Sequence, residues 1–223
     1  MLNDIDAIIF DIDGTLIDSM WIWTNIDDLF LEKYNLKQPP NFHEGMEGKS
    51  YSETAQYFLD IFPELTHTRE ELEEEWYQMA FDIYTKEISL KDGAYDFIVK
   101  MYHEGKKLGI ATSNTRALAE GTLKNNRVFE YMHSVWTSDE AKVGKPSPDV
   151  YLRVAESLNV SPSRCLVFED VPKGIMAGKS AGMKVCAIDD PFSRPQEELK
   201  RELADYYIKD FNDVLNNTYE VLE

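Results

Sequence analysis

Apolar residues recur along this chain with two different spacings, which separate a helical block from a block of alternating strands and helices. The first apolar run, Ile-Ile-Phe at residues 8–10, is short and continuous, as is typical of a parallel strand buried on both faces. Apolar positions then recur at helical spacing and predict helices over residues 20–34, 52–61 and 68–86. We expect no strand in this helical block.

The first of these helices is amphipathic. Its apolar face is expected to contain Trp21, Trp23, Ile26, Leu29 and Phe30. Two consecutive prolines follow the helix and end it, because proline lacks the backbone N–H that a helix interior needs. The third helix opens with a dense run of glutamates. These acids complement the positive end of the helix dipole, and we interpret the run as a solvated helix face.

From residue 92 onward, strands and helices alternate. Alternation of this kind predicts a parallel sheet covered by helices on both faces, and the strand at residues 8–10 belongs to the same sheet. The predicted strands lie at residues 107–112, 134–136, 165–168, 184–188 and 205–208, with helices at residues 93–103, 116–125, 148–158, 172–181 and 196–203 and a last helix near the end.

The predicted fold class is therefore α/β: a doubly wound, Rossmann-like parallel sheet core with an inserted α-helical cap domain. The core is expected to comprise residues 1–15 and 89–223. The cap is expected to comprise residues 16–88, inserted after the first strand.

Composition restricts the possible partners. The chain of 223 residues has 43% hydrophobic residues, enough for a substantial core. Its formal net charge of −18, from 41 acidic and 23 basic residues, argues against a nucleic-acid partner, and an anionic substrate needs local neutralisation by a metal ion or by lysines. The apolar runs are shorter than a membrane span, and the first residues do not resemble a signal peptide. We expect no membrane partner, a cytoplasmic location and, by default, a monomer.

Polar side chains follow several of the predicted strands, at the edge of the sheet where open α/β folds bind ligands. Each cluster by itself also fits a turn or a helix cap, but their joint arrival at successive strand ends favours a functional site. Hydroxyl and amide groups can donate hydrogen bonds to phosphate, and carboxylates suit a hard cation. The clusters are Asp11 and Asp13, then Thr112, Ser113 and Asn114, then Lys145 in a Gly-Lys-Pro segment, and Glu169 with Asp170.

These clusters together resemble the motifs of the haloacid dehalogenase-like hydrolase superfamily, in the β-phosphoglucomutase and phosphoglycolate phosphatase branch that carries a helical cap. The first motif is similar to Asp-Ile-Asp-Gly-Thr at residues 11–15, and the second ends at Thr112. The third contains Lys145, and the fourth consists of Glu169 and Asp170. The resemblance covers the whole chain.

The resemblance implies a role for each cluster. Asp11 would be the nucleophile that forms an aspartyl-phosphate, and Asp13 the general acid and base. A magnesium ion would be bound by Asp11, Asp13, Asp170 and Glu169. The phosphoryl group would be held by Lys145 and by the hydroxyl and amide groups of Thr112, Ser113 and Asn114.

The implied function is a magnesium-dependent phosphatase that hydrolyses a small phosphorylated metabolite, such as a sugar phosphate. Asp13 separates this reaction from dehalogenation, because the dehalogenases of the superfamily lack an acid/base aspartate there. A β-phosphoglucomutase-type mutase is the first alternative, although the histidine and arginine of its cap are replaced by Trp23 and Tyr51. A non-catalytic phosphate-binding protein is the second. The substrate is expected to contact cap residues chosen from Trp21, Trp23, Met46, Glu47, Lys49 and Tyr51.

Overall fold

Seven strands form one sheet in the computed structural model, which describes residues 1–222. The strand order is β3-β2-β1-β4-β5-β6-β7, and all pairings are parallel except that of β7 with β6. The strands are β1 (Ala7–Phe10), β2 (Lys107–Thr112), β3 (Ser134–Thr137), β4 (Cys165–Glu169), β5 (Lys184–Ile188), β6 (Tyr206–Ile208) and β7 (Glu220–Val221). The predicted fold class is confirmed, and the short antiparallel β7 is an addition to it.

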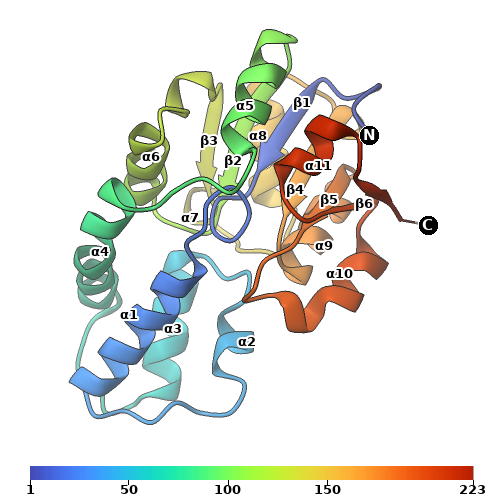
Figure 1. Ribbon diagram of the computed structural model, residues 1–223. Coiled ribbons are helices and arrows are strands. Elements are labelled where there is room, and N and C mark those ends of the chain that lie inside the picture. The colour runs from blue at the N-terminus through green and yellow to red at the C-terminus, as the bar shows by residue number, and fades with distance from the viewer. Residues whose placement is uncertain (223) are drawn as a thin grey trace.

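Helices cover both faces of the sheet (Figure 1). Successive side chains of a strand point to opposite faces, so the four buried residues of β1 divide between two cores. Ile8 and Phe10 pack in one core with α5, α6 and α11, whereas Ala7 and Ile9 pack in the other with α8 and α9. These helices are α5 (Ala94–His103), α6 (Arg116–Asn125), α8 (Asp149–Leu158), α9 (Pro172–Ser180) and α11 (Phe211–Asn216), with α7 (Ser138–Ala141) and α10 (Glu197–Leu203) between them.

Four helices lie between β1 and α5, beyond the carboxyl end of β1 (Figure 1). They are α1 (Met20–Lys33), α2 (Phe42–Met46), α3 (Tyr51–Ile61) and α4 (Arg69–Lys86). Capping boxes at Ser50 and Thr68 begin α3 and α4, since each side chain accepts a backbone N–H that would otherwise be unpaired. The short helix α2 was not expected from the sequence, because five residues are too few to show a periodicity.

The predicted apolar face of α1 is partly wrong. Trp21 and Leu29 are 51% and 52% exposed, whereas Ile22 is fully buried beside Ile26 and Phe30. The buried stripe thus recurs every four residues, the spacing that keeps side chains on one face of a helix. The apolar character of Trp21 and Leu29 alone did not distinguish this stripe from the exposed side of the helix.

The chain crosses between the sheet and the helical insertion twice, and the two crossings pair with each other. The backbone N–H of Asp18 donates to the carbonyl of Ser89 (3.1 Å), and that of Lys91 donates to the carbonyl of Leu16 (3.0 Å). We propose this pairing as the boundary between a core of residues 1–15 and 89–223 and a cap of residues 16–88. No helix within residues 1–222 has the length and apolar content required to cross a bilayer.

Candidate active site

The strand-end residues converge at the carboxyl edge of β1, β2 and β4. Asp11 directly follows β1, Thr112 ends β2, and Glu169 ends β4. Because β1 lies between β2 and β4 in the sheet, all three strand ends open on the same side of the molecule. Lys145 comes from the loop between α7 and α8, and its ammonium reaches back to this edge.

Three carboxylates form a buried cluster there. Asp11, Glu169 and Asp170 each offer an oxygen within 4.8 Å of the others. Burial raises the pKa of Asp11 to about 7, and although Lys145 opposes that effect, the charge of Glu169 adds to it. Burial also raises the pKa of Asp170 well above its usual range, reinforced by Glu169 and Asp11. Crowded acids of this kind are stabilised by a cation placed among them.

Lys145 supplies one positive charge to this cluster. Its Nζ lies 2.6 Å from Asp11 Oδ1 and 2.5 Å from Glu169 Oε1. Burial alone would lower the pKa of the ammonium, but the carboxylates of Asp11 and Glu169 outweigh burial and raise it. Lys145 is therefore held in its charged form directly beside Asp11, where it can also contact an anion.

The carboxylate of Glu169 is fully engaged by protein groups. Oε1 accepts from Lys145 and from the hydroxyl of Tyr151 (2.7 Å), and Oε2 accepts from the backbone N–H groups of Asp170 (3.0 Å) and Val171 (3.3 Å). At Gly174, a Cβ atom would lie only 1.9 Å from Oε1, so this helix position has no room for a side chain. Glu169 thus holds the lysine and the start of the following loop.

Asp170 differs from Glu169 in having a free oxygen. Its Oδ1 accepts from the hydroxyl of Thr15 (3.0 Å), whereas Oδ2 is buried and has no hydrogen-bond partner among residues 1–222. An unpaired buried carboxylate oxygen is costly, and a coordinated metal ion would satisfy it. The cluster therefore fits a hard divalent cation, with Asp11 and Asp170 best placed to bind it.

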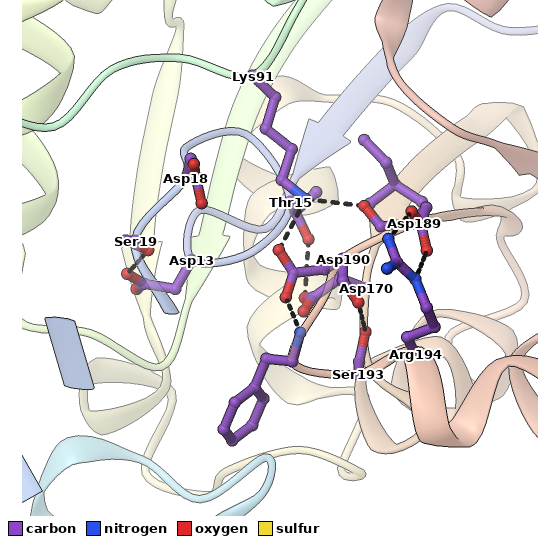
Figure 2. A network of polar contacts seen from close by, with 12 residues as sticks. Asp13, Thr15, Asp18, Ser19, Lys91, Asp170, Asp189, Asp190, Ser193 and Arg194 are labelled. Carbon is purple, nitrogen blue, oxygen red and sulfur yellow. Dashed lines mark hydrogen bonds and ion pairs between the residues drawn. The ribbon is translucent and has the colours of Figure 1, made fainter. Parts of the chain in front are cut away.

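The loop after β5 is fixed by a network of polar contacts (Figure 2). Lys91 Nζ lies 2.8 Å from Asp190 Oδ2 and also donates to the carbonyl of Asp189 (2.8 Å). The hydroxyl of Ser193 donates a hydrogen bond to the backbone carbonyl of Asp190 and accepts one from Nζ of the buried Lys200 (2.9 Å). These contacts fix the loop at the edge of the site, and none of them was apparent in the sequence.

Asp13 lies apart from the three-carboxylate cluster and accepts four hydrogen bonds. Its Oδ1 accepts from Ser19 (2.7 Å), from Trp23 Nε1 (3.4 Å) and from the hydroxyl of Tyr84, while Oδ2 accepts from Asn114 Nδ2 (3.0 Å). Trp23 and Tyr84 belong to α1 and α4, so the helical insertion touches this carboxylate directly. Sequence reasoning did not find Tyr84, which lies in a helix that carried no recognisable motif.

The cluster after β2 is only partly open. Thr112 is fully buried and its hydroxyl accepts the backbone N–H of Asn114 (3.0 Å), so it shapes the turn. Asn114 donates to Asp13, and Ser113 lies 3.5 Å from the hydroxyl of Ser138. Ser113 and Asn114 line the cavity at this site, whereas Thr112 does not. Ser113 is thus the hydroxyl of this group placed to meet a ligand.

A cavity of about 430 Å³ lies between the strand ends and the helical insertion. Asp11, Asp13, Lys145 and Asp170 line one end of it. Five of the six cap residues expected to contact substrate line the rest, and Trp21 does not, since its indole donates to the backbone of Asp18 at the surface. The five are Trp23, Met46, Glu47, Lys49 and Tyr51.

The insertion is held against the sheet domain beside this cavity. The carboxylate of Glu47 accepts from the backbone N–H of Lys173 (3.3 Å) and from Gln196 Nε2 (2.8 Å), and Lys173 Nζ donates to the Glu47 carbonyl (2.9 Å). The ring of His43 also contacts that of Phe192, with centroids 5.7 Å apart. The structure is thus a closed arrangement in which both parts of the chain surround the cavity.

Asp27, which lines the cap wall of the cavity, is expected to reduce the stability of the fold at high pH. Burial, reinforced by the charge of Asp28, raises its pKa to about 7, so ionisation costs more in the folded chain than in the unfolded one, and the cost grows as pH rises from about 4 to 7. Asp27→Asn should therefore raise the melting temperature by about 3 °C or more at pH 8 and by less at pH 5. Thermal melts at both pH values measure this, with Asp4→Asn, which changes an exposed acid away from the cavity, as control. An equal gain at both pH values would contradict it.

Comparison with known proteins agrees with this geometry. A family model described as haloacid dehalogenase-like hydrolase matches residues 8–188. The chain is 32% identical over 198 residues to (DL)-glycerol-3-phosphatase 2 of Arabidopsis thaliana, covering 85% of this chain and 81% of that protein. It is 30% identical over 197 residues to a probable pseudouridine-5'-phosphatase of Drosophila melanogaster, covering 86% and 84%.

Solved structures show the same fold. CbbY from Rhodobacter sphaeroides in complex with phosphate superposes with a TM-score of 0.80 at 22% identity, over 94% of this chain and 96% of that one. β-Phosphoglucomutase from Clostridium difficile superposes with a TM-score of 0.79 at 22% identity, over 94% and 93%. Given the match to the family model and relatives at 30% identity or more, the chain belongs to the haloacid dehalogenase-like hydrolase family, as its strand-end motifs indicated.

Proposed function

We propose that this enzyme is a magnesium-dependent phosphatase that hydrolyses a small phosphate monoester through an aspartyl-phosphate on Asp11. The proposal rests on four residues that line one cavity. Asp11 lies beside Lys145, Asp13 is held separately, and Asp170 has an unpaired oxygen. A nucleophile, a charge for the phosphoryl oxygens, an acid/base and a metal ligand are the parts that phosphoryl transfer to a carboxylate needs.

Asp11 and Asp13 have different tasks in this proposal. A carboxylate oxygen of Asp11 attacks phosphorus, and the bond from phosphorus to the ester oxygen breaks as that oxygen takes a proton from Asp13. Asp13 then takes a proton from a water molecule, and the water oxygen attacks phosphorus. The bond between phosphorus and the Asp11 oxygen breaks, which releases inorganic phosphate and restores the Asp11 carboxylate. The donors around Asp13 orient it toward the reacting oxygen, as a general acid/base requires. Lys145 and Ser113 contact the phosphoryl oxygens.

Magnesium is the proposed cofactor. The side chains of Asp11 and Asp170 would bind it, together with the backbone carbonyl of Asp13. Glu169 belongs to the acidic cluster, but its oxygens already accept four hydrogen bonds, so we assign it to holding Lys145. The ion would neutralise negative charge on the transferring phosphoryl group.

The metal can be tested without an activity assay. Magnesium should raise the melting temperature of the EDTA-treated wild-type protein, because a ligand that binds only the folded state stabilises it. In Asp170→Asn the shift should largely disappear, since the unpaired carboxylate oxygen is lost. Asp4→Asn, which changes an exposed acid far from the cavity, should keep the full shift. An unaltered shift in Asp170→Asn would remove Asp170 from the metal site.

The decisive test of the function is release of phosphate from p-nitrophenyl phosphate with magnesium and its loss after EDTA. Mutase activity is the alternative, and the fold similarity to β-phosphoglucomutase justifies testing it. Trp23 and the buried Tyr51 occupy the cap positions that match the histidine and the arginine of β-phosphoglucomutases. The absence of these two mutase residues favours hydrolysis. Conversion of β-glucose 1-phosphate to glucose 6-phosphate with a bisphosphate activator would favour the mutase. Binding of magnesium and a phosphate mimic without any turnover would favour a non-catalytic role.

A further inference from the structure

The cap wall of the cavity contains two polar groups that the protein leaves unpaired. One is the carboxylate of Asp27 on α1, a residue 9% exposed, which accepts no hydrogen bond from residues 1–222. The other is the indole N–H of Trp76 on α4, a residue 3% exposed, which has no acceptor within the same range. Buried polar groups are nearly always paired, so unpaired groups in a cavity wall indicate a ligand.

Other polar side chains of this wall are already satisfied. The hydroxyls of Thr24 and Thr54 each donate to the backbone carbonyl four residues earlier in the sequence. The hydroxyl of Tyr51 donates to the backbone carbonyl of Glu73. The Glu47 carboxylate pairs with the sheet domain, as described above. Among the buried side chains of the cap wall, Asp27 and Trp76 are thus the ones with bonding capacity to spare.

The neighbour of Asp27 does not neutralise it. His43 Nδ1 lies 3.6 Å from Asp27 Oδ2, too far for a hydrogen bond. Gln38 Nε2 can only donate, so at 3.1 Å it makes His43 Nε2 an acceptor, and burial lowers the pKa of this histidine. His43 is therefore neutral and supplies no positive charge to Asp27, which ionises above about pH 7.

We propose that Asp27 and Trp76 select the organic part of the substrate, and that this part is a small polyol with a free hydroxyl and no second anionic group. A hydroxyl both donates and accepts, so the hydroxyls of a polyol can donate to Asp27 and accept from Trp76. A carboxylate or a second phosphate would be repelled by Asp27, and an ammonium group has no lone pair for Trp76. This inference rests on the proposed phosphatase function and specifies its substrate class.

Lys49 also lines the wall and is the feature that opposes this proposal. Its ammonium lies 6.0 Å from the ring centre of Tyr57, which is not among the residues that line the cavity. If Lys49 governed recognition, a substrate with a second anion would be preferred. The two possibilities therefore predict opposite orders of preference and can be separated by kinetics.

The test compares three esters with the same three-carbon skeleton at pH 8, where Asp27 is ionised: glycerol 3-phosphate, propyl phosphate and 3-phosphoglycerate. In the wild type, kcat/KM should be highest for glycerol 3-phosphate, by about tenfold or more over each of the others, the range expected for an unpaired buried polar group or a repelled charge. Preference for 3-phosphoglycerate would overturn the proposal, and so would equal use of propyl phosphate.

Asp27→Asn keeps the shape of the side chain and removes its charge. We expect the ratio of kcat/KM for glycerol 3-phosphate to that for 3-phosphoglycerate to fall by about tenfold. Asp4→Asn, the same change at an exposed acid away from the cavity, should leave the ratio as in the wild type. An unchanged ratio in Asp27→Asn would remove Asp27 from substrate selection. Absence of turnover of any ester by the wild type, p-nitrophenyl phosphate included, would instead refute the phosphatase function.

Discussion

Replacement of Asp11 by asparagine is expected to reduce magnesium-dependent phosphate release by at least about 10⁴-fold, because an amide is a poor nucleophile toward phosphorus. Asparagine matches the carboxylate in shape, and Lys145 keeps its contact with Glu169, so the fold should be retained. The carboxyl it replaces is buried with a pKa raised to about 7, which means that loss of its charge does not penalise folding.

The measurement is phosphate release from p-nitrophenyl phosphate, with circular dichroism and a thermal melt to verify folding. Asp18→Asn is the matched control, because it removes an exposed carboxylate seven residues away in the same loop and should keep wild-type turnover. A folded Asp11→Asn protein that still turns over at more than about one hundredth of the wild-type rate would exclude Asp11 as the nucleophile.

Replacement of Asp13 by asparagine is expected to lower turnover by about 10²- to 10⁴-fold and to change its time course. p-Nitrophenolate is a good leaving group that needs little protonation by an acid. Formation of the aspartyl-phosphate should therefore still occur with this ester. Hydrolysis of the aspartyl-phosphate still needs a base to take the proton of water. We therefore expect a burst of p-nitrophenol, about one per enzyme, followed by a slow steady rate.

An alkyl phosphate such as glycerol 3-phosphate should show no burst in the same variant, because its leaving oxygen needs the proton that Asp13 supplies. Rapid-quench measurement of both esters separates the two steps. Equal losses for both esters without a burst would indicate that Asp13 maintains the geometry of the site and does not transfer protons. The amide of asparagine can still accept from Ser19 and Trp23, so gross collapse of the loop is not expected.

The strand-end residues were predictable because both their local pattern and their meeting place follow from simple rules. An apolar run followed by acids marks the end of a buried strand, and the alternation of strands and helices predicts a parallel sheet. Parallel strands bring their carboxyl ends to one edge, so Asp11, Glu169 and Asp170 had to lie near one another. The position of Lys145 was also expected, but through resemblance to the family.

The buried face of α1 was harder to predict. Trp21 and Ile22 are adjacent and both apolar, and helical spacing allows either to face the interior. Which side of α1 is buried depends on where α4 packs, and that packing joins segments about fifty residues apart. Intrinsic hydrophobicity therefore identified the helix without identifying its inner side.

The sequence by itself determined the fold class, three of the four inserted helices and the acids of the reactive edge, since each follows from periodicity or from a motif at a strand end. Only the tertiary structure decided which of these carboxylates already accept hydrogen bonds from the protein and which have a free oxygen. The hydrogen bonds from Tyr84 and Asn114 to Asp13 join residues 71 and 101 positions apart. The saturation of Glu169, the free oxygen of Asp170 and the unpaired Asp27 likewise depend on which donors fold back onto each carboxylate. Hydrogen-bond pairing depends on distances in space, which spacing along the chain does not encode.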